Sequence, residues 1–276
     1  MAALLALASS VLWGTADFLG GVAARRRATW QVVVWSQTIA GCVLVAAVLS
    51  TSAWRGVAPG AWTAWALMAG ATGFAGLLSF YAALAQGTMG VVSPIAAMGV
   101  LVPLAVGLAS GERLSHAHAI GVAAAIVGIV LASGPELSAR SPWRPVILAA
   151  LAALCFGVAI VGVARGSQVS VLMTMLVMRV FSVAIFLAAM LRAPSMRTLG
   201  RGEFWPLLVI GVVDVAANIA YGFAARLEAL AIVSVLGSIY PIVTVALARF
   251  VLKERLARIQ YVGVAVAMAG VAFISL

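Results

Sequence analysis

Three charged side chains lie deep inside long apolar stretches of the sequence: Asp17, Arg179 and Asp214. If these stretches cross a bilayer, each charge costs about 2.5–3.5 kcal/mol to insert, so it needs a partner, a wet cavity or a function. Asp17 follows Trp13 by one helical turn on the same face. It could reach the interface and pair with the arginines at residues 25–27, or it could stay buried as a group that exchanges a proton for a cation.

Arg179 and Asp214 lie on consecutive apolar stretches that would run in opposite directions, at depths that differ by about 3 Å. They could form a structural ion pair, or the pair could line a cavity in which a bound zwitterion or a proton competes for one partner. Asp214, Asn218 and Tyr221 are spaced at i, i+4 and i+7, so they share one helix face. That polar stripe predicts either hydrogen bonds to neighbouring helices or contact with a solute-filled cavity.

Aromatic and small polar side chains within the apolar stretches are further candidate contacts for a solute. Aromatic rings could form the walls of a site for an amphipathic solute, and hydroxyl groups could orient it. The aromatic candidates are Trp13, Tyr81, Tyr221 and Tyr240, and the small polar candidates are Ser93, Ser234 and Ser238. Pro94, Pro103 and Pro241 would free backbone carbonyls, either as hinges or as simple kinks.

The composition indicates that all these residues belong to an all-α integral membrane protein. Hydrophobic residues make up 65% of the 276 positions and charged residues only 9%, too few to cover a water-soluble surface. A helix needs about 20 apolar residues to cross a bilayer, and breaks at charged or turn-forming residues divide the chain into ten such helices. Their expected ranges are 3–23, 30–50, 61–84, 90–109, 117–133, 145–164, 170–191, 204–225, 230–251 and 258–276.

An internal repeat divides this single membrane domain into two halves, residues 1–138 and 139–276. Gly-Glu-Arg-Leu-Ser at residues 111–115 returns as Lys-Glu-Arg-Leu-Ala at residues 253–257, a displacement of 142. At the same displacement, small residues that favour close helix packing recur: Gly121, Ala125 and Gly128 as Gly263, Ala267 and Gly270. Each half holds five helices, and an odd number of crossings inverts the second half, which predicts alternating access.

These features resemble the EamA-like branch of the drug/metabolite transporter superfamily over essentially the whole chain. The resemblance is carried by Leu12-Trp13-Gly14, Arg179, Pro241 thirteen residues before Glu254, the two Glu-Arg-Leu elements and the glycine-rich fifth and tenth helices. It implies a ten-helix secondary transporter with a central cavity, similar to exporters of amino acids, other metabolites or toxic compounds. It also makes Asp17 similar to the first-helix carboxylate of small multidrug transporters. Gln37, which the repeat maps onto Arg179, stands where the family often has an arginine.

Positive charge indicates orientation here and not nucleic-acid binding, because the arginines lie mostly at helix ends. Twelve of the 17 basic residues fall in the odd-numbered connections with their flanks, which places those connections in the cytoplasm and both termini outside. The family resemblance implies the opposite orientation. Glu112 and Glu254 are expected to pair with basic neighbours at the headgroups.

The function predicted from these observations is secondary active transport, as a proton-coupled exporter of small amphipathic cationic or zwitterionic metabolites. Two candidate carboxylates against one arginine at mid-depth favour that cargo over anions. A passive facilitator or channel, or a non-transporting scaffold, is the alternative. Motifs of phosphate loops, metalloproteases and serine hydrolases are missing, so we expect neither an enzyme, a cofactor nor a metal. The expected setting is a bacterial plasma membrane, with a small solute and lipid as partners and the chain as a monomer or homodimer.

Overall fold

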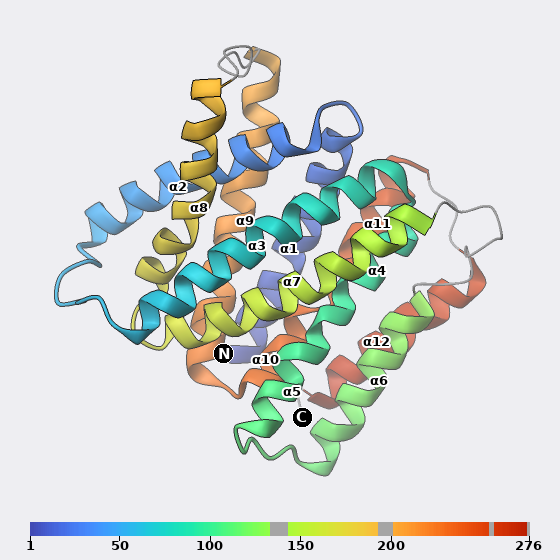
Figure 1. Ribbon diagram of the computed structural model, residues 1–276. Helices are drawn as coiled ribbons and strands as arrows, with labels where there is room; N and C mark the ends of the chain where they lie inside the picture. Colours follow the sequence, from blue (N-terminus) through green and yellow to red (C-terminus); the bar gives the residue numbers. More distant parts are fainter. Residues whose placement is uncertain (133–142, 193–200, 254–256, 275–276) are drawn as a thin grey trace.

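The computed structural model describes residues 1–132, 143–192, 201–253 and 257–274, and these ranges are helical apart from short connections (Figure 1). The elements are α1 (Ala2–Ala24), α2 (Thr29–Thr51), α3 (Ala61–Gln86), α4 (Met89–Ala97), the 3-10 helix η1 (Met98–Val100), α5 (Leu101–Ala109), α6 (His116–Ala132), α7 (Trp143–Ser167), α8 (Val171–Arg192), α9 (Arg201–Leu227), α10 (Leu230–Gly237), α11 (Tyr240–Val251) and α12 (Arg258–Ile274).

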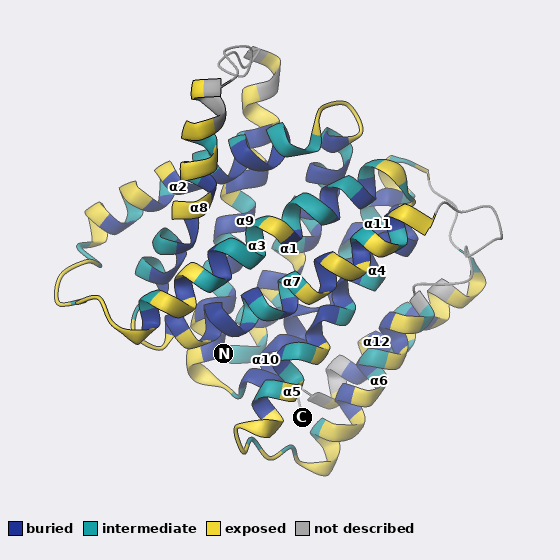
Figure 2. Cartoon of the chain, in the orientation of Figure 1, coloured by how far each residue is buried: buried dark blue, intermediate teal, exposed yellow. Residues whose placement is uncertain are grey.

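Ten crossings account for these helices. Within the described ranges, eight segments are long and apolar enough to span a membrane, with residues 89–109 and 230–251 each counted as one interrupted span, and α6 and α12 add two shorter apolar helices. Large apolar side chains are exposed, such as Leu154 at 62% and Phe250 at 80%. Exposed residues alternate with buried ones along helices such as α6 and α12 (Figure 2). Such a surface suits lipid, and backbone groups paired within helices suit a medium without water. The predicted fold class, an all-α membrane protein, is confirmed.

The two halves pack around each other as inverted five-helix repeats. The repeat displacement relates α1 to α7 and α3 to α9, and in the structure α1 packs against α9 while α3 packs against α7. The helices α2 and α8, related in the same way, pack against each other, and so do α6 and α12, which lie side by side at the edge of the bundle (Figure 1). A pseudo-two-fold axis therefore passes between the members of each self-related pair.

The crossing of α6 and α12 depends on the small residues that recur between the halves. A Cβ atom added to Gly128 would meet the backbone of Ala267, and one added to Gly270 would meet the backbone of Ala125. The two backbones can approach this closely only because glycine stands at both positions. The prediction that these small residues favour close helix packing is therefore confirmed, and the structure adds that the two glycine-rich helices pack against each other.

The fourth and ninth spans are both interrupted near their middle. α4 ends at Ala97 and continues through η1 into α5, while α10 ends at Gly237 and α11 begins at Tyr240. Pro103 lies in the first turn of α5 and Pro241 lies in the first turn of α11, each directly after the break, while Pro94 lies inside α4. Proline lacks the N–H that would donate to the carbonyl four residues earlier and crowds the preceding turn, which explains why the helices break before Pro103 and Pro241. The interruptions leave short half-helices that end inside the bundle.

Candidate functional site

A cavity lies at the centre of the bundle and contains about 740 Å³ of empty space, its open mouth included. It is lined by α1, α2, α3, α7, α8 and α9 and by the residues around the interruption between α10 and α11. Most lining positions, such as Asp214 in α9, lie near the middle of their helices. The cavity is therefore at the depth where a membrane carrier would hold its cargo.

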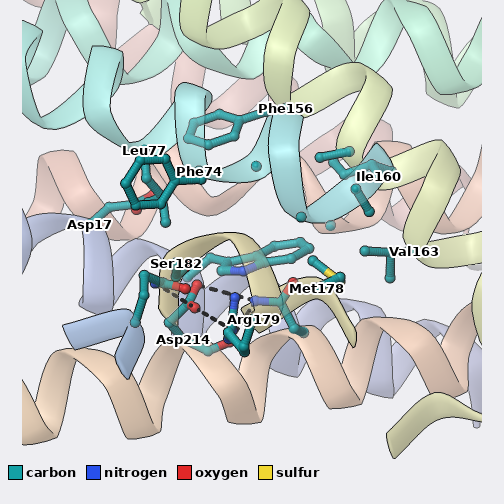
Figure 3. A pocket seen from close by; sticks show the side chains of 18 of the residues that line it. Asp17, Phe74, Leu77, Phe156, Ile160, Val163, Met178, Arg179, Ser182 and Asp214 are labelled. Atoms are coloured by element: carbon teal, nitrogen blue, oxygen red, sulfur yellow. Dashed lines mark hydrogen bonds and ion pairs between the residues drawn. The ribbon is translucent and has the colours of Figure 1, made fainter. Parts of the chain in front are cut away.

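One wall of the cavity is polar and is organised around Asp214 (Figure 3). Arg179 Nη2 donates to Asp214 Oδ2 at 2.9 Å, and Gln37 Nε2 donates to the same oxygen at 3.2 Å. Asn218 Nδ2 donates to Asp214 Oδ1 at 3.1 Å and to the Asp214 carbonyl oxygen at 2.8 Å. The predicted Arg179–Asp214 pair is present, with 7% and 9% of the two side chains exposed, and it also lines the cavity. Three helices, α2, α8 and α9, are joined at this carboxylate.

Asp17 lines the same cavity from α1, but its carboxylate is not held by neighbouring side chains as that of Asp214 is. The residue is 7% exposed and forms no hydrogen bond or ion pair with any residue that the structure describes. No ion pair joins Asp17 to Arg25 in the described part of the chain, and Nε and Nη2 of that arginine donate to the Leu84 and Gly87 carbonyl oxygens at 3.2 and 3.3 Å. A buried carboxylate without a partner is costly, so it favours a bound proton or cation.

The opposite wall is apolar and comes from α3 and α7. Phe74 and Leu77 face the cavity from α3, and Phe156, Ile160 and Val163 face it from α7 (Figure 3). This α3–α7 wall is related by the repeat to the α9–α1 wall that carries the acidic residues. The cavity is consequently amphipathic, although the two walls descend from the same repeat.

Comparing equivalent positions shows how the walls came to differ. A displacement of 143 takes Trp13 to Phe156 and Asp17 to Ile160. In the second pair one repeat has a carboxylate where the other has an apolar side chain. The repeats therefore differ in charge at this position, while aromatic rings line the cavity from both.

The structure places six of the ten predicted substrate contacts on the cavity wall: Trp13, Asp17, Arg179, Asp214, Asn218 and Tyr240. The other four lie outside the residues that line it: Tyr81, Ser93, Tyr221 and Ser234. Ser238, a further small polar candidate, does line it.

Three of those four outlying residues lie directly behind the wall. The Tyr81 hydroxyl donates to the Ala16 carbonyl oxygen at 3.5 Å, next to Asp17 in the chain. The Tyr221 ring lies 5.5 Å from the Trp13 ring, and its hydroxyl is 2.7 Å from Ser234 Oγ. These side chains support the residues that face the cavity.

Comparison with known proteins identifies the family. The sequence model of the EamA-like transporter family matches residues 1–134 and, separately, residues 143–276. The chain belongs to the EamA-like transporter family. A solved structure titled "Crystal structure of protein" is 21% identical, covers 99% of this chain over 95% of its own, and superposes with a TM-score of 0.71, which supports the fold alone. No curated protein matches the sequence.

Family membership agrees with the expected relationship to the drug/metabolite transporters and makes this protein a multi-pass membrane transporter of small molecules. Each half of the chain matches the family by itself, as two copies of one five-helix unit should. The apolar helices and the central cavity fit that general role.

Several cavity residues of this EamA-like transporter were missed in the sequence because they are ordinary apolar side chains. Phe74, Leu77, Val163 and Met178 look like any other residue of a membrane helix until the helices are placed. Two others had a signal in the repeat, since Phe156 corresponds to Trp13 and Ile160 to Asp17. Ser182, three residues after Arg179 and on its face of α8, could have been found from spacing.

The expectation for Glu112 was wrong. In this EamA-like transporter, its two carboxylate oxygens accept hydrogen bonds from the backbone N–H groups of Leu230 and Ala231, at 3.0 and 2.9 Å. The first N–H groups of a helix have no acceptor within the helix, and they carry the positive end of the helix dipole. A carboxylate from outside the helix is therefore a favourable acceptor for them. Glu112 of the first repeat thus caps α10 of the second, and Glu254 lies outside the described residues.

Proposed function

We propose that this protein is a secondary active exporter that exchanges protons for small amphipathic metabolites carrying an amine, as cations or zwitterions. The observation that carries the proposal is the Asp17 carboxylate, which has no partner among the described residues, in a cavity with one polar and one apolar wall. An ammonium group or a proton would compensate Asp17, and the apolar part of the cargo would lie against α3 and α7. Protonation of Asp17 would then release the cargo, which is the basis of exchange.

The inverted repeats support alternating access as the mechanism. Two related halves can open toward either side of the membrane at similar energy, and the interrupted spans provide places where each half can bend. Asp214 joins α2, α8 and α9 through Gln37 and Arg179, so a cargo that disturbs this network could bias one arrangement over the other. We place the protein in the bacterial plasma membrane, as a monomer or homodimer.

The test needs a cargo, which metabolite profiling of cells with and without the protein should identify. The purified protein is then reconstituted in liposomes, and uptake of that metabolite is measured under an imposed pH gradient. We expect accumulation above the equilibrium level, and its loss when an uncoupler removes the gradient. Equilibration without accumulation would instead support a passive facilitator.

Asp17→Asn is the decisive variant in this assay. The asparagine keeps the shape of the side chain but holds neither a proton nor a charge, so we expect gradient-driven uptake to fall by about 100-fold, the scale of losing one charged interaction. Thr15→Val is the matched control, because Thr15 lies two residues away, outside the cavity wall, and its hydroxyl bonds within its own helix to the Val11 carbonyl oxygen at 2.8 Å. Full proton-driven transport by Asp17→Asn would overturn the proposal.

A further inference from the structure

Gln37 and Arg179 occupy equivalent positions of the two repeats and meet at the same acceptor. They are separated by 142 residues, on α2 and α8, and both donate to Oδ2 of Asp214. The two helices are in direct contact here, since a Cβ atom added to Gly41 would lie 3.6 Å from the Cβ atom of Arg179. The only difference between the two donors that bears on charge is that Arg179 is a cation and Gln37 is neutral.

That difference determines the formal charge of the cavity. Among the described residues that line it, the side chains with a formal charge at neutral pH are Asp17, Arg179 and Asp214. Arg179 compensates Asp214 directly, at 2.9 Å. Two carboxylates and one guanidinium leave one negative charge uncompensated, and this charge belongs to Asp17. An arginine at position 37, as the other repeat has at 179, would have balanced it.

We propose that Gln37 is the residue that sets the charge preference of the cavity, and that it selects a small organic monocation over a zwitterion of the same size. The proposal rests on the proposed function and narrows its cargo. A neutral amide satisfies the second donor position on Asp214 without adding charge, so the field of Asp17 is left for the cargo. In a site of low dielectric, one unbalanced charge favours an occupant of opposite net charge and disfavours one that also brings a carboxylate.

A matched series of three small molecules can measure this preference. Phenethylamine, phenylalanine and phenylacetate share a phenyl ring, which suits the wall formed by Phe74, Leu77 and Phe156, but they carry net charges of about +1, 0 and −1 at neutral pH from their amine and carboxyl groups. Their binding is measured with the full-length protein in detergent, using radiolabelled compounds and equilibrium dialysis. The ratio of dissociation constants between the amine and the amino acid is the readout.

We expect the unmodified protein to bind phenethylamine at least about tenfold more tightly than phenylalanine, with phenylacetate weakest. Gln37→Arg should bring the ratio between the amine and the amino acid to about one, because it cancels the unbalanced charge. Gln37→Met is the matched control: it removes the hydrogen bond to Asp214 without adding charge, so affinity falls for all three compounds while their ratio persists. If Gln37→Arg is not monodisperse, Gln37→Lys replaces it with the same expected result.

The inference would be overturned by no binding of phenethylamine to the unmodified protein, by no preference for it over phenylalanine, or by an unchanged preference in Gln37→Arg. A loss of the preference in Gln37→Met would also overturn it, because the effect would then come from the hydrogen bond and not from charge. The proposed function fails separately, through the transport assay with Asp17→Asn. Charge-selective binding without transport would support the inference about Gln37 and contradict the proposed export function.

Discussion

At the scale of single residues, the two buried carboxylates of the cavity differ in how they are held. Asp214 accepts hydrogen bonds on both of its oxygens, from Gln37, Arg179 and Asn218. Asp17 has no such partner among the described residues. A carboxylate whose two oxygens are both hydrogen-bonded holds its neighbours together, whereas a carboxylate without partners is available to a cargo. We therefore propose the organising role for Asp214 and the exchange role for Asp17.

Removing one member of the Arg179–Asp214 pair should destabilise the protein strongly. Removing both charges together should destabilise it much less. Arg179→Gln or Asp214→Asn alone leaves a buried charge without its partner and should lower the free energy of unfolding by about 3–5 kcal/mol. The double variant leaves two amides and should recover more than half of that loss. The free energy of unfolding can be followed by titration with sodium dodecyl sulfate in mixed micelles. Additive losses in the double variant would show that the two charges do not depend on each other.

The sequence could predict this pair because depth along two consecutive antiparallel helices already places Arg179 beside Asp214. It could not predict that Asp17 would stay unpartnered. The arginines at residues 25–27 were plausible partners, and only the packing of α1 against α3 shows that Arg25 bonds to backbone carbonyls there. The repeat identified Gln37 as the counterpart of Arg179. That both residues donate to Asp214 could not be predicted, because it depends on how α2, α8 and α9 pack together.

At the scale of helices, the interrupted spans depend on partners from the other repeat. α10 is eight residues long, and its first N–H groups, from Leu230 and Ala231, are satisfied by Glu112 from the connection after α5. Arg165, near the end of α7, donates to Ser110 Oγ in the same connection at 2.8 Å. These contacts link the first repeat to the second on one side of the membrane, so the connection at residues 110–115 stabilises both halves.

Replacing Glu112 tests this cap. Glu112→Ala leaves two helix N–H groups without an acceptor and should lower the free energy of unfolding by about 1–2 kcal/mol, whereas Glu112→Gln keeps one acceptor and should lose less. Glu228→Gln is the control, because among the described residues that exposed carboxylate accepts only from the N–H of the next residue, Ala229, at 3.0 Å. If Glu112→Ala were as stable as Glu228→Gln in the same detergent titration, the cap would have no energetic role.

The sequence predicted the helices well and their interruptions poorly. Expected and observed ends agree within about three residues for most helices, because charged and turn-forming residues mark the membrane boundaries. The breaks at residues 98–100 and 238–239 lie inside continuous apolar runs, where hydropathy gives no signal. Pro94 and Pro241 suggested a bend, but only the structure shows that each span becomes two half-helices.

At the scale of the whole molecule, one five-helix unit used twice has produced a cavity with two unlike walls. The α9–α1 side carries Asp17, Asp214 and Asn218, and the α3–α7 side carries apolar residues. The repeat in the sequence predicted the inversion and the pairing of related helices. It could not predict the unlike walls, because that requires knowing which side chains face inward. We propose that the symmetric halves let the carrier open to both sides and that the unlike walls give its cargo one orientation.

Counterflow in liposomes measures most directly whether this cavity opens alternately to the two sides of the membrane. Liposomes containing the protein and unlabelled phenethylamine are diluted into a trace of the labelled compound, and internal label is followed over time. An alternating carrier should give a transient rise of label above its final equilibrium level, and Asp17→Asn should abolish that rise. A smooth approach to equilibrium without a maximum, unaffected by Asp17→Asn, would contradict the account.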